Sequence, residues 1–506
     1  MKFKDQRPRV KEDPFFIGID IGTGSVKAIL VNSRGTVLGS SASEYTTRYP
    51  GSRQVEQDPE DWYRGAAEAV RRLVVESSIG LAKIAGIGLC GTSHAPILLD
   101  GGGKILRPAI LWSDQRSGRE VEELKAEAEK EISELTWNDI NCTWTLPQLL
   151  WIRRHEPETY KKVRNLLISK DYLVYRLTGR MATDFSSAVS TLMVDASTGK
   201  WSGKLVSRAG LNFDIVPEIL APADVVGTLT AEAARDFNLL RTTRVTAGFL
   251  DSAAEMAGLG ALDEPIGVIR LGNAGGVMTV KGKGRHRKNC LAYPHPVEPR
   301  WYYQAGTNAC TTSLLWVRNL FAKKGRGLSY PRIDALSRQI PPGAEGLLFH
   351  PYLLGERSPH WEPCLRGGFN GLTPTHGKAH FFRAVQEGVA FSLRDCLAEV
   401  DWTGVSEARI CGGGAKSEFW CEVIADVFGL PVVRMRYDDA SAYGAALLAA
   451  ASVTGRGIEG LAGKWVRRKD RFDPDPVRHE VYRKIHERYQ AFAKGLTGFY
   501  KIDHCT

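Results

Sequence analysis

Long apolar runs are missing from this 506-residue sequence. No run approaches the roughly 20 residues that a helix needs to span a bilayer. The N-terminal stretch MKFKDQRPRVKEDP is charged where a signal peptide has an apolar core. These absences predict a cytoplasmic protein that has no membrane partner.

Paired cysteines and blocks of like charge are also missing. The nine cysteines show no C-x-x-C spacing, which argues against a zinc site and a disulfide scaffold and predicts buried free thiols. The formal net charge is +10, yet basic residues are interleaved with acidic residues along most of the chain. This pattern predicts a solvated surface that attracts phosphorylated substrates, and no nucleic-acid partner.

The P-loop pattern G-x-x-x-x-G-K-[S/T] does not occur in the sequence either. In its place, residues 15–28 read FFIGIDIGTGSVKA, two apolar runs joined by the turn Gly22-Thr23-Gly24, with Asp20 at the end of the first run. Glycines let backbone N–H groups approach an anion. A carboxylate beside phosphates requires a bridging divalent cation, because two anions in contact repel. The stretch predicts a site for Mg²⁺ and a nucleotide; an ordinary hairpin turn is the alternative.

Short apolar runs alternate with longer amphipathic stretches along the chain, which predicts an α/β protein. The runs predicted as strands are residues 84–89, 245–249, 268–271 and 408–411. The stretches predicted as helices are residues 59–76, 118–135, 147–155, 379–400 and 417–428.

A second strand, glycine turn and strand follows at residues 268–280, VIRLGNAGGVMTV. This repeat indicates an internal duplication in which two similar domains each offer one phosphate-binding turn. The boundary is predicted within residues 258–267, GLGALDEPIG, because this segment has glycines, a proline and few large apolar residues. We therefore expect an N-terminal domain at 15–257 and a C-terminal domain at 258–500.

Several stretches, in this order and spacing, resemble the FGGY family of carbohydrate kinases, and within it the xylulose kinases. The stretches lie at residues 18–28 (GIDIGTGSVKA), 91–117 (GTSHAP to SDQRS), 247–260 (AGFLDSAAEMAGLG), 353–372 (LLGERSPHWEP to FNGL), 410–432 (ICGGGAKSEFW to GLPV) and 438–449 (DDASAYGAALLA). The resemblance implies two actin-like (ribonuclease H-like) domains with a nucleotide cleft between them. It also implies ATP-dependent phosphorylation of a sugar.

The resemblance implies roles for two aspartates. Asp251 matches the catalytic aspartate and would act as the general base, whereas the alternative is a helix cap, because a helical stretch opens there. Asp20 matches the magnesium-binding aspartate, and the alternative is a cap of the turn. Gly22, Thr23 and Gly24 match the first phosphate loop of the family.

The second phosphate loop departs from the family pattern. Gly272 matches, but Asn273 and Ala274 stand where the family has a threonine and a serine. An asparagine amide still donates to a phosphate oxygen, so we expect phosphate binding to be retained. The loss of the two hydroxyls bears on the nucleotide affinity or on the identity of the phosphate donor.

The segment 412–417 resembles the part of the family that lies along the adenosine. Gly413 and Gly414 would leave space for the ligand. Ser417 is expected to cap the following helix. An ordinary strand-to-helix turn would require one glycine rather than three.

Ser93-His94 stands where xylulose kinases have a Met-His pair that contacts the ketose. His94 suits hydroxyl groups because an imidazole both donates and accepts, and Trp144 is a candidate wall against the C–H face of the sugar. Structural roles are the alternatives for all three. We interpret Glu356-Arg357 as architectural.

These matches predict phosphorylation of D-xylulose to D-xylulose 5-phosphate, with Asp251 also in contact with the sugar. The alternatives are another ketopentose, a polyol or gluconate as the substrate. A catalytically weak sugar-binding regulatory protein is a rival of another class, although such a protein would need neither Asp20 nor Asp251. An actin-like filament or chaperone ATPase would share only the turns. The sequence leaves a homodimer open.

Overall fold

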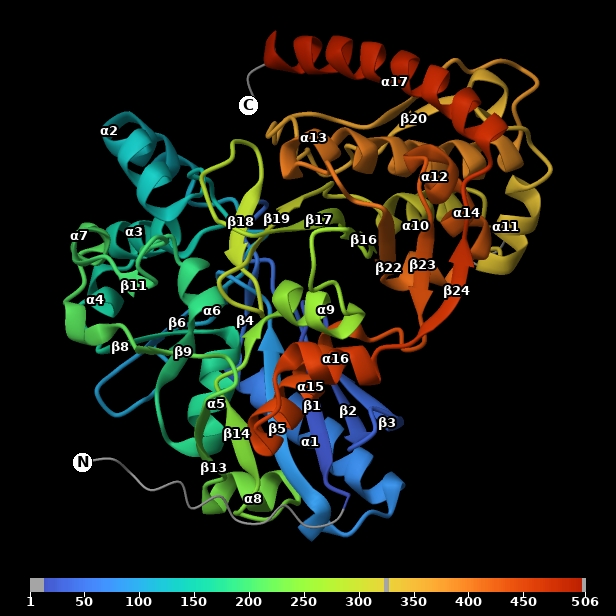
Figure 1. Cartoon of the computed structure of the whole chain (residues 1–506). Helices are drawn as coiled ribbons and strands as arrows, with labels where there is room; N and C mark the ends of the chain where they lie inside the picture. The colour runs from blue at the N-terminus through green and yellow to red at the C-terminus, as the bar shows by residue number, and fades with distance from the viewer. Residues whose placement is uncertain (1–12, 323–326, 503–506) are drawn as a thin grey trace. The chain divides into compact units, whose positions relative to one another are not determined.

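The computed structural model describes residues 13–322 and 327–502, and the chain divides into two compact units (Figure 1). Within the described residues, unit 1 comprises the chain up to Leu262, Tyr293–Arg300 and Ala440–Val466. Unit 2 comprises Asp263–Ala292, Trp301–Asp439 and the chain from Arg467. The segment Ala440–Val466 thus belongs to unit 1. The predicted domains, 15–257 and 258–500, are two consecutive ranges and place this segment in the C-terminal domain.

Unit 1 is built on a seven-stranded sheet. Its main path is β13 (Val225–Thr228), β14 (Arg244–Thr246), β5 (Ile84–Gly91), β1 (Phe15–Ile21), β2 (Ser25–Asn32) and β3 (Val37–Glu44), and β15 (Phe249–Leu250) also pairs with β5. The strands β1, β2 and β3 pair in antiparallel order, whereas β1, β5 and β14 pair in parallel.

Unit 2 repeats this pattern in its own seven-stranded sheet. The order is β18 (Leu291–Pro294), β19 (Trp301–Ala305), β17 (Gly275–Lys281), β16 (Ile266–Leu271), β22 (Glu407–Cys411), β23 (Val432–Met435) and β24 (Arg468–Phe472). Here β16, β17 and β19 are antiparallel, and β16, β22 and β23 are parallel. The same arrangement of one hairpin and two parallel neighbours therefore occurs twice, as the duplication predicts.

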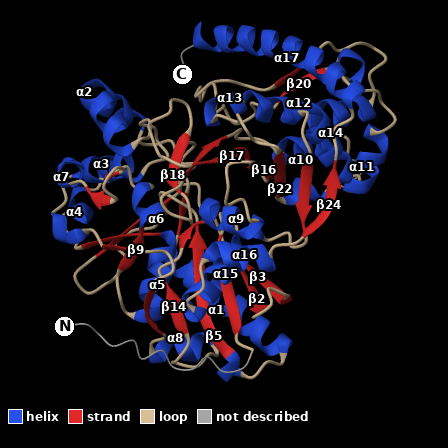
Figure 2. Ribbon diagram, viewed as in Figure 1, coloured by secondary structure: helices blue, strands red, loops and turns tan. Residues whose placement is uncertain are grey.

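Each unit contains helices in addition to its sheet (Figure 2). Those of unit 1 are α1 (Pro59–Ser77), α2 (Gly118–Thr136), α3 (Thr145–His155), α4 (Pro157–Tyr160), α5 (Ser169–Thr178), α6 (Phe185–Val189), α7 (Gly203–Ala209), α8 (Ala231–Phe237), α9 (Asp251–Leu259), α15 (Ala440–Thr454) and α16 (Ile458–Trp465). Those of unit 2 are α10 (Thr311–Leu320), α11 (Tyr330–Ser337), α12 (Lys378–Asp395), α13 (Leu397–Val400), α14 (Glu418–Phe428) and α17 (Pro476–Ile502).

Short strand pairs complete the two units. In unit 1 they are β4 (Glu56–Gln57) with β7 (Ala109–Ile110), β6 (Pro96–Leu99) with β8 (Asn165–Ile168), β9 (Ala182–Asp184) with β12 (Glu218–Leu220), and β10 (Val194–Asp195) with β11 (Lys200–Trp201). In unit 2, β20 (Leu348–His350) pairs with β21 (Gly368–Asn370).

The two faces of strand β1 pack against different helices. Ile17, Ile19 and Ile21 join a buried cluster with residues of α1, whereas Gly18 faces α15, because a Cβ added to it would lie 1.9 Å from the carbonyl oxygen of Ala442. Successive residues of a strand point to opposite faces, so α1 and α15 cover opposite faces of the sheet.

Most predicted elements agree with the structure to within two residues, and two differ. The run 245–249 is divided between β14 and β15, because Gly248 between them has a φ of +81° and therefore cannot continue a regular strand. The stretch 379–400 contains α12 and the separate short helix α13.

Seven cysteines are free thiols and six of them are buried, in line with the sequence analysis. Cys364, in contrast, is disulfide-bonded. Cys505 lies outside the described residues. None of the helices in the described part of the chain has the length and apolar character needed to cross a membrane.

Gly88 of β5 provides a test of the close packing of α15. We expect Gly88→Ala to lower the free energy of unfolding by about 1–3 kcal/mol, because the new Cβ would lie 1.8 Å from the carbonyl oxygen of Ala445. In the control Gly80→Ala the new Cβ meets no atom within 4 Å, so the change should stay within about 0.5 kcal/mol. Urea denaturation measures both, and equal midpoints would contradict this account.

Candidate active site

Asp20 and Asp251 lie at the same edge of the unit 1 sheet, on either side of β5. Asp20 is paired in register with Cys90 of β5, and Phe249-Leu250 of β15 is paired with Cys90 and Gly91. The carboxyl ends of parallel strands meet at one edge of a sheet, where α/β proteins commonly bind ligands. The Cys90 thiol donates a hydrogen bond to Asp20 Oδ1 at 3.5 Å.

The electrostatic effect of nearby carboxylates on the Cys90 thiol shows that Asp20 and Asp251 both lie close to it. Burial raises the pKa of its thiol well above the usual value, and the negative charges of Asp20, Asp251 and Glu255 raise it further. An anion at Cys90 would therefore be repelled by three carboxylates. Negative charge gathered at one point suits the binding of a cation.

Asp251 is the first residue of α9 and its side chain is half-buried. Its Oδ1 accepts a hydrogen bond of 2.7 Å from the backbone N–H of Ser252, and the helix N-terminus favours a negative charge. Leu250, rather than Asp251, occupies the cap position. The predicted base thus lies in the first helical turn, where its charged form is stabilised.

A buried ion cluster contacts the segment that precedes Asp251. Lys170 Nζ contacts Asp171 at 2.5 Å and Asp184 at 3.0 Å, and donates to the carbonyl oxygen of Ala247 at 2.9 Å. Asp184 also caps α6, where the Ser186 hydroxyl accepts a 3.0 Å hydrogen bond from the N–H of Leu250. These contacts fix both ends of the segment that leads to Asp251.

The turn between β1 and β2 is held through its carbonyl oxygens. The Tyr45 hydroxyl donates to the oxygen of Gly22, Gln57 Nε2 to that of Thr23 at 2.6 Å, and the Tyr45 N–H to that of Gly24 at 3.4 Å. Within the described residues, the N–H groups of Thr23 and Gly24 have no acceptor. Both residues are exposed, so these donors are available to an anion.

The turn between β16 and β17 of unit 2 is built in the same way. The oxygen of Gly272 accepts from the N–H of Thr311 at 2.9 Å, and that of Asn273 accepts from the N–H of Cys310 at 2.8 Å. In the part of the chain that the structure describes, the N–H groups of Asn273 and Ala274 lack an acceptor. The loss of the two family hydroxyls therefore leaves the backbone donors in place.

The three positions of segment 412–414 differ in why they carry glycine. Gly412 has a φ of +89°, and a Cβ on Gly414 would lie 2.8 Å from Leu271 Cβ. A Cβ on Gly413, in contrast, would meet no atom within 4 Å. Only at Gly413 does the fold itself leave the missing side chain unexplained. Ser417 caps α14, since its Oγ accepts from the N–H of Trp420 at 2.9 Å.

His94 is almost fully buried, with 2% of its surface exposed. Its Nδ1 lies 2.8 Å from the carbonyl oxygen of Ser190. An oxygen of this kind only accepts, so Nδ1 carries the proton and Nε2 accepts from the Tyr293 hydroxyl at 3.0 Å. Trp144 is fully buried and packs edge-to-face on His94, with 4.7 Å between ring centroids. Ser93 is half-buried.

The comparison with known proteins decides the family. The sequence profiles of the FGGY family of carbohydrate kinases match residues 15–258 with the N-terminal domain and residues 267–453 with the C-terminal domain. This chain belongs to the FGGY family of carbohydrate kinases. The predicted α/β class, two-domain actin-like fold and enzyme class are thereby confirmed.

Individual FGGY kinases are similar over nearly their whole length. The xylulose kinase of Bacillus subtilis is 33% identical over 94% of this chain and 96% of its own. The xylulose kinase of Klebsiella pneumoniae is 35% identical, over 87% and 90%. The crystal structure of xylulose kinase from Rhodospirillum rubrum is 29% identical, with a TM-score of 0.86 over 96% of this chain and 100% of that one.

The residues of this FGGY chain fit a magnesium ion. Among the described side chains, no group of three or more His, Cys, Asp or Glu residues is arranged to hold a metal. Mg²⁺ typically takes one or two carboxylates and keeps water and phosphate oxygens as its other ligands. Asp20, with Asp251 at the same edge, provides such a partial set.

Sequence reasoning missed several residues that support the site, among them Tyr293, Lys170 and Ser186. Tyr293 lies 199 residues from its partner His94, and no local pattern connects them. Lys170 offered a weak signal, because Ser169-Lys170-Asp171 places a cation and an anion in an otherwise apolar stretch.

Glu356 of the GERSPHWEP motif is buried. Its oxygens accept hydrogen bonds from the Thr307 hydroxyl at 2.6 Å, the N–H of Asn308 at 3.0 Å and the N–H of Arg357 at 2.7 Å. Burial raises the pKa of this carboxyl to about 7, an effect that the three hydrogen bonds only partly oppose.

Lys170 provides a test of the buried ion cluster. We expect Lys170→Met to lower the free energy of unfolding by about 3–5 kcal/mol, because Asp171 and Asp184 would remain buried without their cation. The control Lys161→Met removes an exposed pair with Glu158, worth about 0–1 kcal/mol. Chemical denaturation compares the two, and similar small losses would show that the buried cluster carries little stability.

Glu356 gives the stability a defined dependence on pH. Its pKa is raised in the folded state, so the stabilising contribution is present below the ordinary pKa and is lost as the pH rises to about 7. This shift corresponds to about 3 kcal/mol. The free energy of unfolding of Glu356→Gln, relative to wild type, should therefore increase from pH 5 to pH 8 in urea denaturation. Parallel pH profiles would contradict the raised pKa.

Proposed function

We propose that this FGGY kinase transfers the γ-phosphoryl group of ATP to D-xylulose, giving D-xylulose 5-phosphate and ADP. The observation that carries the proposal is the position of Asp20 and Asp251 on either side of β5, at the edge where β1 ends and α9 begins. In this proposal Asp20 binds the metal ion, and Asp251 takes the proton of the acceptor hydroxyl.

Asp251 is the general base in this proposal. Its carboxylate takes the proton of the sugar hydroxyl as that oxygen attacks the γ-phosphorus, and the bond from the γ-phosphorus to the bridging oxygen breaks. The helix N-terminus and the N–H of Ser252 favour the negative charge of the Asp251 carboxylate. The contacts of Ala247 and Leu250 hold the aspartate in place.

ATP and Mg²⁺ are the phosphate donor and the metal in this proposal. The N–H groups of Thr23 and Gly24 in unit 1, and of Asn273 and Ala274 in unit 2, are the donors assigned to phosphate oxygens. Gly413 leaves room for the adenosine, beside Gly414 and Ser417. Asp20 holds Mg²⁺, which would neutralise phosphate charge.

The choice of D-xylulose rests on the xylulose kinase relatives and on Ser93-His94. His94 has a fixed tautomer and is supported by Ser190 and Tyr293, so its ring cannot turn freely. We assign the contact with the ketose to Ser93 and to the cluster of His94, Trp144 and Tyr293. Ser93 in place of the family methionine gives this wall a smaller and more polar side chain.

A coupled assay that detects ADP, run with saturating MgATP over a panel of ketopentoses, polyols and aldonates, tests the proposal. We expect D-xylulose to give the highest kcat/KM. Asp251→Asn, which cannot take a proton, should lower kcat by about 10²–10⁴, while the KM for the sugar changes little. Asp214→Asn, an exposed aspartate of the same unit, serves as the control and should keep the wild-type kcat.

Two results would overturn parts of the proposal. A higher kcat/KM for gluconate or a polyol would replace D-xylulose and leave the base assignment intact. Full turnover by Asp251→Asn would remove Asp251 as the base.

A further inference from the structure

Glu356 is a buried carboxylate whose hydrogen-bond donors carry no charge. They are one hydroxyl and two backbone N–H groups, and two of the three belong to Thr307 and Asn308. Burying this carboxylate costs free energy, which the neutral donors and the nearby charge of Arg357 only partly offset, and a raised pKa of this kind is more common at functional sites than elsewhere. Thr307 and Asn308, which Glu356 binds, belong to a segment that contacts the second phosphate-binding turn.

The segment 306–311 fixes the second phosphate-binding turn. The N–H of Gly275 donates to the oxygen of Thr307 at 3.0 Å, and the N–H of Thr307 donates back to Gly275 at 3.1 Å. The approach is so close that a Cβ on Gly306 would lie 2.1 Å from the oxygen of Gly275. The N–H groups of Cys310 and Thr311 then bind the oxygens of Asn273 and Gly272.

This arrangement links Glu356 to the turn in two steps. The carboxylate holds Thr307 through its side chain and Asn308 through its backbone, and the 306–311 segment holds the turn from the carbonyl side. The N–H groups of Asn273 and Ala274 are thereby left without an acceptor in the described part of unit 2. Movement of Thr307 would change the position of these donors.

We propose that Glu356 is a positioning residue for nucleotide binding, which fixes Thr307 and Asn308 so that the turn 272–276 keeps its N–H groups directed to phosphate oxygens. The inference rests on the proposed nucleotide site of unit 2 and goes beyond it, because Glu356 acts through the 306–311 segment. The loss of the two family hydroxyls at Asn273 and Ala274 makes the backbone donors, and hence their support, more important in this chain.

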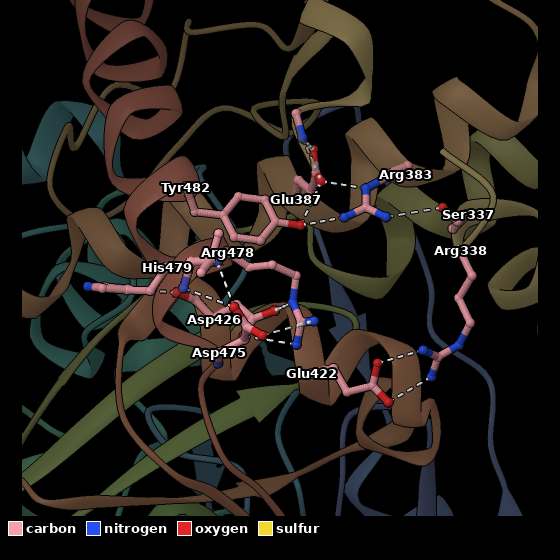
Figure 3. Close-up of polar contacts among 12 residues, drawn as sticks. Ser337, Arg338, Arg383, Glu387, Glu422, Asp426, Asp475, Arg478, His479 and Tyr482 are labelled. Carbon is pink, nitrogen blue, oxygen red and sulfur yellow. Dashed lines mark hydrogen bonds and ion pairs between the residues drawn. The ribbon is translucent and has the colours of Figure 1, made fainter. Parts of the chain in front are cut away.

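A second buried carboxylate of unit 2 offers a matched control. Glu387 of α12 pairs with Arg383 at 2.6 Å, accepts from the Tyr482 hydroxyl at 2.8 Å and from the N–H of Gly343 at 3.0 Å (Figure 3). These contacts attach α17 and the loop before β20, and none of them involves residues 306–311. Glu387 thus has the burial of Glu356 without its connection to the turn.

The experiment measures the affinity of the full-length protein for MgADP by isothermal titration calorimetry, together with the KM values for ATP and sugar. Glu356→Ala removes both carboxylate oxygens and hence all three hydrogen bonds. Thr307→Val removes one donor, and Glu356→Gln keeps the shape of the side chain. In the glutamine variant the amide oxygen still accepts two N–H groups, and the amide donates to the Thr307 hydroxyl.

We expect Glu356→Ala to weaken MgADP binding about tenfold and Thr307→Val about threefold, because each leaves a buried polar group unsatisfied. The KM for ATP should rise in parallel while the KM for the sugar stays unchanged. Glu356→Gln should restore the affinity to within about twofold of wild type. Glu387→Gln should lower the thermal midpoint and leave MgADP affinity unchanged, since the uncompensated Arg383 affects stability alone.

Wild-type affinity for MgADP in Glu356→Ala, or equal increases in the KM for ATP and for the sugar, would overturn the inference. If Glu356→Ala does not fold, the MgADP affinity and the two KM values of Thr307→Val test the inference in its place. Absence of MgADP binding by the wild-type protein would instead overturn the nucleotide site of the proposed function.

Discussion

The contact of α15 with the sheet of unit 1 is the constraint on which the site depends. Gly18 of β1, Gly88 of β5 and Gly258 of α9 each lie so close to the α15 backbone that a Cβ would come within 2 Å of a carbonyl oxygen. These three elements carry Asp20, Cys90 and Asp251. Because interiors are close-packed, one helix fixes the relative positions of the two carboxylates, although it supplies neither.

The two glycine turns share one arrangement of hydrogen bonds. A hairpin turn in water satisfies its donors and acceptors with solvent, but here the acceptors are bound by the protein and the donors are left over. In unit 1 the side chains of Tyr45 and Gln57 bind the carbonyl oxygens, whereas in unit 2 backbone groups of the 310–311 segment do so. Anion binding by such turns depends on this asymmetry rather than on the glycines alone.

The sequence allowed prediction of the elements whose signal is local. Apolar periodicity located β5, β16 and β22, and the turns stood out by their glycines. The division of 245–249 was not predictable, because no local pattern indicates that Gly248 has a positive φ and lies close to Leu89 of β5. The partners of His94 were hidden for a similar reason: Ser190 and Tyr293 lie 96 and 199 residues away. β24 is an edge strand of the unit 2 sheet, and the charged side chains along it oppose pairing with another chain.

The buried carboxylates of the two units differ in the partners that hold them. Asp171, Asp184 and Glu387 each face a buried lysine or arginine. The cation partly offsets the cost of burying the acid, although burial still raises the pKa of Asp171 and of Glu387. The hydrogen bonds of Glu356 come from a hydroxyl and two N–H groups. Burial raises its pKa to about 7, although these bonds and the charge of Arg357 lower it. A role in stability alone would be served better by a neutral side chain of the same shape. The free energy lost at Glu356 is therefore best understood as the cost of fixing the segment that holds the phosphate-binding turn.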